Sequence, residues 1–290
     1  MAGIFLFIVF QTNPRYEEKS LTEGEKQSAG PSEQFAESQF TKRLPVAKNK
    51  VNPNDFVVPI LMYHHIGVNT DVSDKIRDDL TVPPDQFEAQ VAWLAKNKYH
   101  SVTLEDVYLH AEGKLKLPSN PIVFTFDDGY DDAILNAVPI LKKYGDVGSF
   151  AIITQWPGTT SGSNTYATWD QIKTAMNQGM EIVSHTQNHF DGTNPTVTKE
   201  YVLKDLKGSV MDLKNHLGIS SDLLIYPYGH YNADYIAAAE EAGFVMGVTV
   251  HEGAVVDPDV LMEIPRIRVH GREELKRFQN ILWGAKHVSL

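Results

Sequence analysis

Strands and helices alternate along most of the chain, and this order restricts the fold more than any other feature. Short apolar runs rich in β-branched residues alternate with amphipathic segments between residues 57 and 284. A helix between two strands returns the chain to the same end of a sheet, so the strands that it joins pair in parallel. The order therefore predicts an α/β fold whose parallel sheet is either doubly wound or closed into a barrel.

The expected elements follow from residue type and period. Predicted strands cover residues 57–65, 122–126, 148–154, 180–184, 223–226, 244–250 and 264–270. Helices are expected at 169–177, 233–242 and 273–283. Three more helices are expected where apolar residues recur at helical spacing. These apolar stripes are Phe87, Val91 and Leu94; Ile134, Val138 and Leu141; and Leu203, Leu206, Val210, Leu213 and Leu217. These stripes indicate core packing.

One of these strands ends at two adjacent carboxylates. The apolar run 122–126 lies between Pro121 and Gly129, and Asp127 and Asp128 follow it directly. Two neighbouring negative charges repel each other and resist burial, unless a cation lies between them or water reaches both. One interpretation is a solvated loop in which Asp128 caps the next helix. The other is a cation site at the carboxyl end of the strand.

Two histidines after another strand favour the cation site. His185 and His189 follow the apolar residues 180–184. On a continuing strand they would lie about 13 Å apart, which is too far to share a metal. A turn of helical pitch brings them to about 6 Å, so the chain is expected to turn after His185. With a strand that ends in Asp-Asp-Gly, this spacing predicts a His-His-Asp metal site.

Three segments together resemble the polysaccharide deacetylases of carbohydrate esterase family 4. They are Thr-Phe-Asp-Asp-Gly at 125–129, His-Thr-Gln-Asn-His at 185–189 and Pro-Tyr-Gly at 227–229. The resemblance covers residues 57–284 and leaves the N-terminal segment unexplained. It selects the barrel over the doubly wound sheet, because these deacetylases have a distorted (β/α) barrel of about seven strands.

The residue types and the resemblance together suggest a hydrolytic site. Asp128, His185 and His189 would hold a divalent metal, most readily zinc, with cobalt or nickel as substitutes. Such a metal lowers the pKa of a bound water, and Asp127, next to a ligand, suits the base that takes the water's proton. The family assigns its first aspartate this role. It also implies that the backbone N–H of Tyr228 stabilises the oxyanion.

The chain departs from the family pattern before Pro227. Most members have an arginine there that pairs with the base, whereas this chain reads Leu-Ile-Tyr at 224–226. In the strand 264–270, alternation places Arg266, Arg268 and His270 on one face. We expect Arg266 to orient Asp127. The family's general-acid histidine ends its last strand, which implies that role for His270. The alternative is a strand whose arginines form salt bridges at the rim.

Other residues are weaker candidates for substrate contact. The resemblance brings in Pro227 together with Tyr228. His64 ends the first strand and so lies at the same rim, although a structural role is the alternative. Trp156 precedes a loop rich in Gly, Ser and Thr, where an aromatic ring could stack on a sugar.

Composition sets further limits. The chain has 290 residues, of which 42% are hydrophobic, which is enough for one core of ordinary size. A net charge of −11 argues against nucleic acid, which requires clustered Lys and Arg. No cysteine is present, so a metal can use only His and carboxylate ligands.

The N-terminal segment, residues 1–54, differs from the rest. Residues 3–10 are strongly apolar but far shorter than the roughly 20 residues that span a bilayer. Residues 12–54 are rich in Ser, Glu, Lys, Gln and Pro, a composition typical of a flexible tether. We interpret 1–54 as an anchor or truncated signal peptide plus a tether, followed by a catalytic domain at 55–290. This layout suggests a monomeric bacterial enzyme that is exported and held at the cell surface.

Three functions remain in competition. The first is a metal-dependent deacetylase that releases acetate from N-acetylglucosamine-containing polysaccharide, such as peptidoglycan, chitin-like oligomers or poly-N-acetylglucosamine. The second is a weakened relative that only binds cell-surface glycan. The third is an amidohydrolase of small molecules on the same fold. The four residues Asp127, Asp128, His185 and His189 favour catalysis over binding alone.

Overall fold

A computed structural model describes residues 56–71 and 73–287 of the chain. The expected N-terminal anchor and tether, residues 1–54, lie outside the described residues. The first described residue, Phe56, is buried and packs edge-on against the ring of His110. Val57 forms a bridge with Val255. The folded part of the chain therefore reaches at least to residue 56, one residue after the predicted start of the domain.

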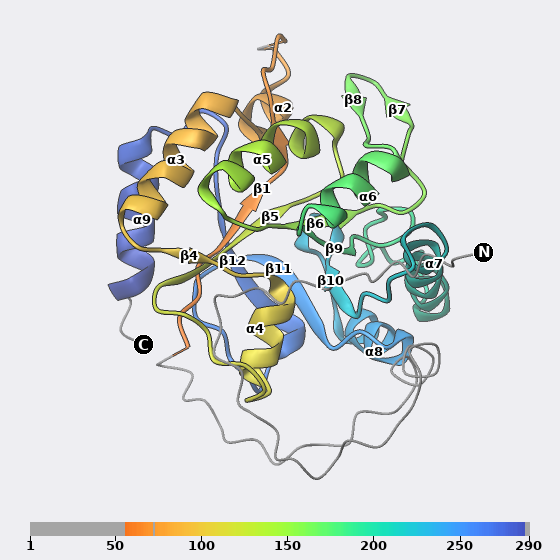
Figure 1. Cartoon of the computed structure of the whole chain (residues 1–290). Helices are drawn as coiled ribbons and strands as arrows, with labels where there is room; N and C mark the ends of the chain where they lie inside the picture. The colour runs from red at the N-terminus through yellow and green to blue at the C-terminus, as the bar shows by residue number, and fades with distance from the viewer. Residues whose placement is uncertain (1–55, 72, 288–290) are drawn as a thin grey trace, which may run out of the picture.

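Within the described residues, parallel strands close into a barrel (Figure 1). Its strands, in order around the barrel, are β1 (Ile60–Tyr63), β12 (Ile264–Arg268), β11 (Met246–Glu252), β10 (Leu223–Ile225), β9 (Glu181–Ser184), β6 (Ser149–Ile152) and β5 (Pro121–Phe126). The barrel is closed because β1 pairs with both β12 and β5. The short β4 (His100–Ser101) pairs with the start of β5. The predicted distorted barrel of about seven parallel strands is confirmed.

Helices surround the barrel (Figure 1). They are α2 (Lys75–Leu80), α3 (Pro84–Lys96), α4 (Leu104–Ala111), α5 (Asp131–Tyr144), α6 (Trp169–Asn177), α7 (Lys199–Leu217), α8 (Ala233–Ala242) and α9 (Leu275–His287). The bounds predicted for α6 and α8 are correct. Thr168 caps α6 and Asn232 caps α8 by accepting a backbone N–H, which explains why these helices begin where they do.

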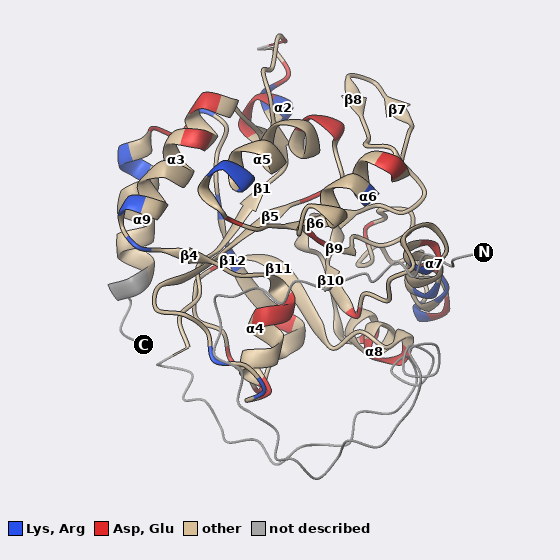
Figure 2. Ribbon diagram, in the orientation of Figure 1, with Lys and Arg blue, Asp and Glu red and all other residues tan. Residues whose placement is uncertain are grey.

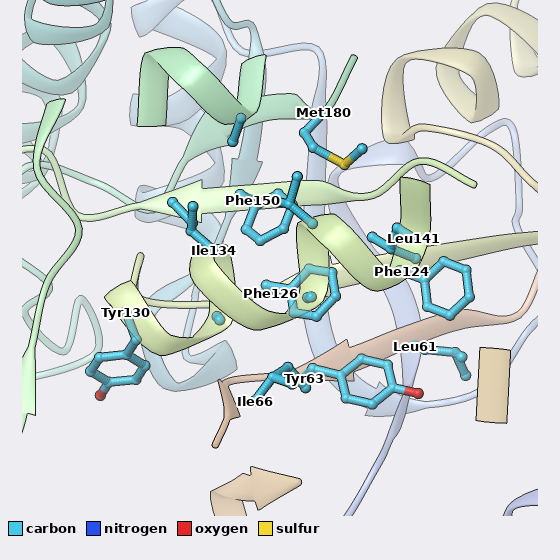
Figure 3. Packing of buried hydrophobic residues seen from close by; sticks show 14 of the residues in the cluster. Leu61, Tyr63, Ile66, Phe124, Phe126, Tyr130, Ile134, Leu141, Phe150 and Met180 are labelled. Carbon is cyan, nitrogen blue, oxygen red and sulfur yellow. The ribbon is translucent and has the colours of Figure 1, made fainter. Parts of the chain in front are cut away.

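The strands place their side chains alternately inside the barrel and against the helices. On β5, Phe124 and Phe126 pack in the outer cluster with Tyr63 and Phe150, and the ring centroids of Phe126 and Phe150 lie 4.5 Å apart (Figure 3). Val123 belongs to a different buried cluster, which also contains residues of β1, β10 and β11. Most charged residues lie on the surrounding helices and loops (Figure 2). Buried Arg266 is an exception.

Two predicted strands end earlier than expected. The run 57–65 is divided into β1 and a two-residue strand β2 (His65–Ile66), which pairs with β3 (Thr81–Val82) outside the barrel. The run 264–270 ends at Arg268. His64 and His270 therefore lie just past strand ends at the carboxyl rim, where side-chain direction no longer follows strand alternation. A small hairpin of β7 (Thr160–Ser161) and β8 (Asn164–Thr165) follows β6.

Candidate active site

The sequence motifs meet at the carboxyl end of the barrel because parallel strands end on the same side. Asp127 and Asp128 follow β5, His185 follows β9, and Tyr228 follows β10. Asp128, His189 and Tyr228 have positive φ angles of 70°, 54° and 57°. Residues other than glycine rarely adopt this left-handed conformation, and it is concentrated here at the site. The expected turn after His185 is present, since Thr186 has φ 68°.

Asp128, His185 and His189 form a compact cluster that suits a divalent metal. Asp128 Oδ1 lies 3.2 Å from the Nε2 atom of each histidine, and the ligand atoms all lie within 4.8 Å of one another. The His185 Nδ1 atom lies 2.7 Å from the carbonyl oxygen of Ile225. Because Nδ1 donates to that carbonyl, Nε2 of His185 faces the cluster and is the nitrogen that could bind a metal. Two imidazole nitrogens and a carboxylate are the donors that zinc prefers.

The charges of this cluster also favour a cation. Burial alone would raise the pKa of Asp128, but hydrogen bonds from His185 and His189 hold it well below its usual value. Burial alone would lower the pKa of His185, but the hydrogen bond to Asp128 raises it. These shifts favour the ionised form of the Asp128 carboxylate, which is the form that binds a metal ion.

Asp127 is held by Arg266, as expected from the sequence. Arg266 Nη1 and Nη2 donate to the two carboxylate oxygens of Asp127 at 2.7 and 2.8 Å. Arg266 also donates to Thr125 Oγ1 at 3.0 Å and to the carbonyl oxygen of Thr249 at 2.7 Å. Burial raises the pKa of Asp127, but the charge and hydrogen bonds of Arg266 outweigh this and lower it. The carboxylate is therefore ionised and fixed in orientation.

His64 lies closer to Asp127 than the sequence indicated. Tyr63 pairs with Phe126, and the Asp127 N–H donates to the Tyr63 carbonyl at 2.9 Å, so the residues after each strand are neighbours. His64 Nε2 lies 4.0 Å from Asp127 Oδ2. Burial lowers the pKa of His64, whereas the charges of Asp127 and Asp128 oppose this shift. Finding this contact requires the strand register, which residue type alone does not supply.

Tyr228 combines an available backbone donor with an exposed ring. Within the described part of the chain, its N–H donates to no other group. Its side chain is 55% exposed, and its ring centroid lies 4.6 Å from that of His189. The ring centroid of Trp156 lies 5.8 Å from that of His189. Pro227 is buried beneath this rim. A partly exposed aromatic edge thus lies beside the candidate metal ligands, and it consists of the rings of Tyr228, Trp156 and His189.

His270 contacts a carboxylate on α2. Its Nδ1 atom lies 2.8 Å from Asp79 Oδ1 on α2, and Arg268 Nη2 donates to the other oxygen of Asp79 at 2.7 Å. The space beside His270, about 390 Å³, is lined by charged residues of α2 and of the segment 272–277. The structure therefore gives His270 a surface ion-pair network and places His64, rather than His270, beside Asp127. Because β12 ends at Arg268, strand alternation does not extend to His270, and the general-acid role expected for His270 stays a prediction.

Tyr130 is a neighbour of the site that the sequence reasoning did not single out. Its buried hydroxyl is hydrogen-bonded to Asp128, and its ring stacks on His65 with centroids 3.7 Å apart. His65 in turn lies 2.9 Å from Asp132 Oδ2 on α5. The position of Tyr130, two residues after Asp128, was the available signal. The hydrogen bond from Tyr130 helps to orient the Asp128 carboxylate.

Comparisons with known proteins agree with this geometry. A family model described as polysaccharide deacetylase matches residues 114–247. The YxkH protein of Bacillus subtilis (strain 168), which carries the name of a polysaccharide deacetylase, is 32% identical over 212 residues; the match covers 73% of this chain and 71% of YxkH. The chain belongs to the polysaccharide deacetylase family. Another relative in the family is the poly-beta-1,6-N-acetyl-D-glucosamine N-deacetylase of Staphylococcus aureus (strain MRSA252), 28% identical over 68% of this chain and 70% of its own length.

Solved structures of polysaccharide deacetylases share the barrel. The Streptococcus pyogenes deacetylase PplD, in complex with acetate, superposes with a TM-score of 0.70 at 28% identity and covers 78% of this chain and 97% of its own. The Bacillus cereus polysaccharide deacetylase BC0361 gives 0.66 at 26% identity, over 78% of this chain and 69% of its own. Within residues 56–71 and 73–287, no helix is both long and apolar enough to cross a membrane.

Proposed function

We propose that this polysaccharide deacetylase is a metal-dependent hydrolase that removes acetyl groups from N-acetylglucosamine-containing polysaccharide. The observation that carries the proposal is the Asp128, His185 and His189 cluster next to an Asp127 carboxylate that Arg266 holds ionised. A ligand set and a base side by side are what the hydrolysis of an amide by activated water requires. The relatives' names indicate the substrate class, since several are N-deacetylases of poly-beta-1,6-N-acetyl-D-glucosamine.

Asp128, His185 and His189 would hold the metal, with zinc preferred and cobalt or nickel as substitutes. When bound, the metal supplies an activated water and polarises the acetamide oxygen. The chain supplies the remaining groups. Asp127 accepts the proton of the attacking water, because Arg266 keeps its carboxylate ionised and directed. The Tyr228 N–H donates to the oxyanion that forms on the acetamide oxygen.

The leaving amine requires a proton, and His64 is placed to supply it. Its Nε2 atom lies 4.0 Å from Asp127 Oδ2, and burial lowers its pKa, so His64 is neutral before the reaction. The proton that Asp127 takes from water can pass to His64 and from there to the leaving nitrogen. This assignment replaces His270, which is bound to Asp79.

The exposed ring of Tyr228 and the neighbouring Trp156 suit a sugar chain that lies across the rim. With the N-terminal composition described above, we infer that the enzyme acts outside the cell on cell-wall or surface polysaccharide, tethered through residues 1–54. It is expected to act as a monomer, because the site is built from one chain.

The test is acetate release from acetylated oligosaccharides by chelator-treated and zinc-reconstituted protein. We expect no activity without metal and recovery with zinc. Release of acetate from simple amides but not from oligosaccharides would instead indicate a small-molecule amidohydrolase. Binding of oligosaccharides without any acetate release would indicate a glycan-binding protein.

Matched variants separate the roles of the two aspartates. His185→Ala and His189→Ala should each abolish metal binding. Asp127→Asn should retain the metal and lose most turnover, because an amide cannot accept the proton of water. If Asp127→Asn released the metal, the roles of Asp127 and Asp128 would have to be exchanged.

A further inference from the structure

The loop between His185 and His189 is attached to one face of helix α7. The Ser184 and Ser209 hydroxyls lie 2.8 Å apart, and Gln187 Nε2 donates to Asp212 Oδ2 at 2.9 Å. Gly208 leaves room for this side chain, since a Cβ at position 208 would lie 2.4 Å from Gln187 Oε1. Helix α7 contributes neither a metal ligand nor a catalytic group, yet it contacts the loop closely.

Asp205 is the centre of this attachment. One carboxylate oxygen accepts the Gln187 N–H at 2.9 Å, and the other accepts from Asn188 Nδ2 at 2.7 Å. The Thr186 hydroxyl also bonds to Asp205, and Thr186 Oγ1 accepts the His189 N–H at 3.0 Å. Asp205 is 3% exposed, so these loop groups replace water around its charge.

We propose that Asp205 is a positioning residue that sets the metal affinity of the site by holding the 185–189 loop in its ligating conformation. The inference rests on the proposed function, because it assumes that His185 and His189 bind a metal. Asp205 touches every residue between the two histidines. It therefore fixes their separation without contacting either ring.

The physical need for such a residue is the conformation of the loop. Thr186 and His189 both have positive φ angles, 68° and 54°. Residues other than glycine rarely adopt this conformation, which persists only where surrounding contacts hold it. Hydrogen bonds to a charged group are stronger than those between neutral groups, so the bonds to Asp205 offset the cost of this conformation. Without them, the loop relaxes and the metal must reorder it on binding, which weakens affinity.

The experiment measures zinc affinity by competition with a chromophoric chelator, together with thermal unfolding of the metal-free protein. Asp205→Asn keeps the shape of the side chain but puts an amide NH2 where one carboxylate oxygen accepted a hydrogen bond, so that two donors face each other. The matched control is Asp146→Asn, which removes a carboxylate that accepts from Ser101 Oγ at the opposite end of the barrel. We expect Asp205→Asn to weaken zinc binding by about ten- to a hundred-fold and Asp146→Asn to leave it unchanged.

A second variant covers the case in which Asp205→Asn does not fold. Asn188→Ala removes only the 2.7 Å bond and should weaken zinc binding by a smaller factor. Unchanged affinity in whichever of these two variants folds would overturn the inference, and so would equal losses in Asp205→Asn and Asp146→Asn. If the unaltered protein bound no zinc, the proposed function itself would fail, which is a separate result.

Discussion

At the scale of single residues, the pair of Arg266 and Asp127 is the most consequential contact. Both side chains are almost fully buried, and Nε, Nη1 and Nη2 of Arg266 donate to oxygens of Thr249, Thr125 and Asp127. Removing one member of such a pair leaves an uncompensated charge, which typically costs about 3–5 kcal/mol. The same contact keeps the base ionised, so it links stability and catalysis.

We expect Arg266→Met to lower kcat by about ten- to a hundred-fold and to move the acidic limb of the pH profile upward. Asp127 must be ionised to act as a base. Arg266 holds its pKa below the usual value, so removing the arginine raises that pKa and makes the carboxyl protonate at a higher pH. The measurement is kcat against pH.

Arg268→Met is the matched control, because Arg268 lies on the same strand but binds Asp79. The acidic limb of the pH profile of Arg268→Met should be the same as in the unaltered protein. Should Arg266→Met prove too unstable, Arg266→Lys keeps the charge without the bidentate contact and should shift the limb less. An acidic limb that is the same in the Arg266 variants and in the unaltered protein would contradict the assigned role.

The role of His64 can be separated from that of His270 by the choice of leaving group. His64→Gln should lower the turnover of acetamide substrates by about a hundred- to ten-thousand-fold. It should affect an aryl acetate far less, because a phenolate leaves without being protonated. His270→Gln should change neither rate by much, since His270 is bound to Asp79 on the surface. If His64→Gln lowered the turnover of the acetamide and of the aryl acetate by the same factor, His64 would have a structural role instead.

At the scale of the elements, the sequence predicted what depends on local pattern. Apolar runs that stop at polar residues located the carboxyl ends of β5 and β9, and the resemblance supplied the closure of the barrel. Features that depend on pairing were missed. His64 meets Asp127 only through the register of β1 with β5. Asp79 was overlooked because α2 is short and none of its residues is buried. Without Asp79, nothing in the sequence indicated where His270 would bind.

The turn after β10 provides a test at this scale. Gly229 has φ +68°, and a Cβ there would lie 2.3 Å from Val250 Cγ2. Gly218, which ends α7, has a similar φ of +73° with nothing within 4 Å. Gly218→Ala should therefore cost only the conformational term, about 1–2 kcal/mol. Gly229→Ala should cost more, because Val250 must also move. Urea unfolding measures both, and equal losses would show that Val250 yields freely.

At the scale of the whole molecule, the described chain forms one barrel with its own core. We expect deletion of residues 1–54 to leave thermal unfolding and acetate release unchanged, because residues 12–54, which adjoin the domain, have too few apolar residues to pack on it. A longer deletion that removes Phe56 and Val58 should lower the unfolding temperature, since both are buried. Loss of activity in the shorter deletion would show that the domain begins earlier.

The order in which the ribosome makes the chain gives the Arg266 contact another consequence. Asp127 and Arg266 are 139 residues apart, so the base emerges long before the strand that carries its partner. Asp128, His185 and His189 have also been synthesised by then. Until β12 is inserted between β1 and β11, the barrel is open and Asp127 lacks its counter-ion. In the proposed mechanism, hydrolytic competence therefore requires that β12 has been made, and a product truncated before residue 266 is expected to lack it.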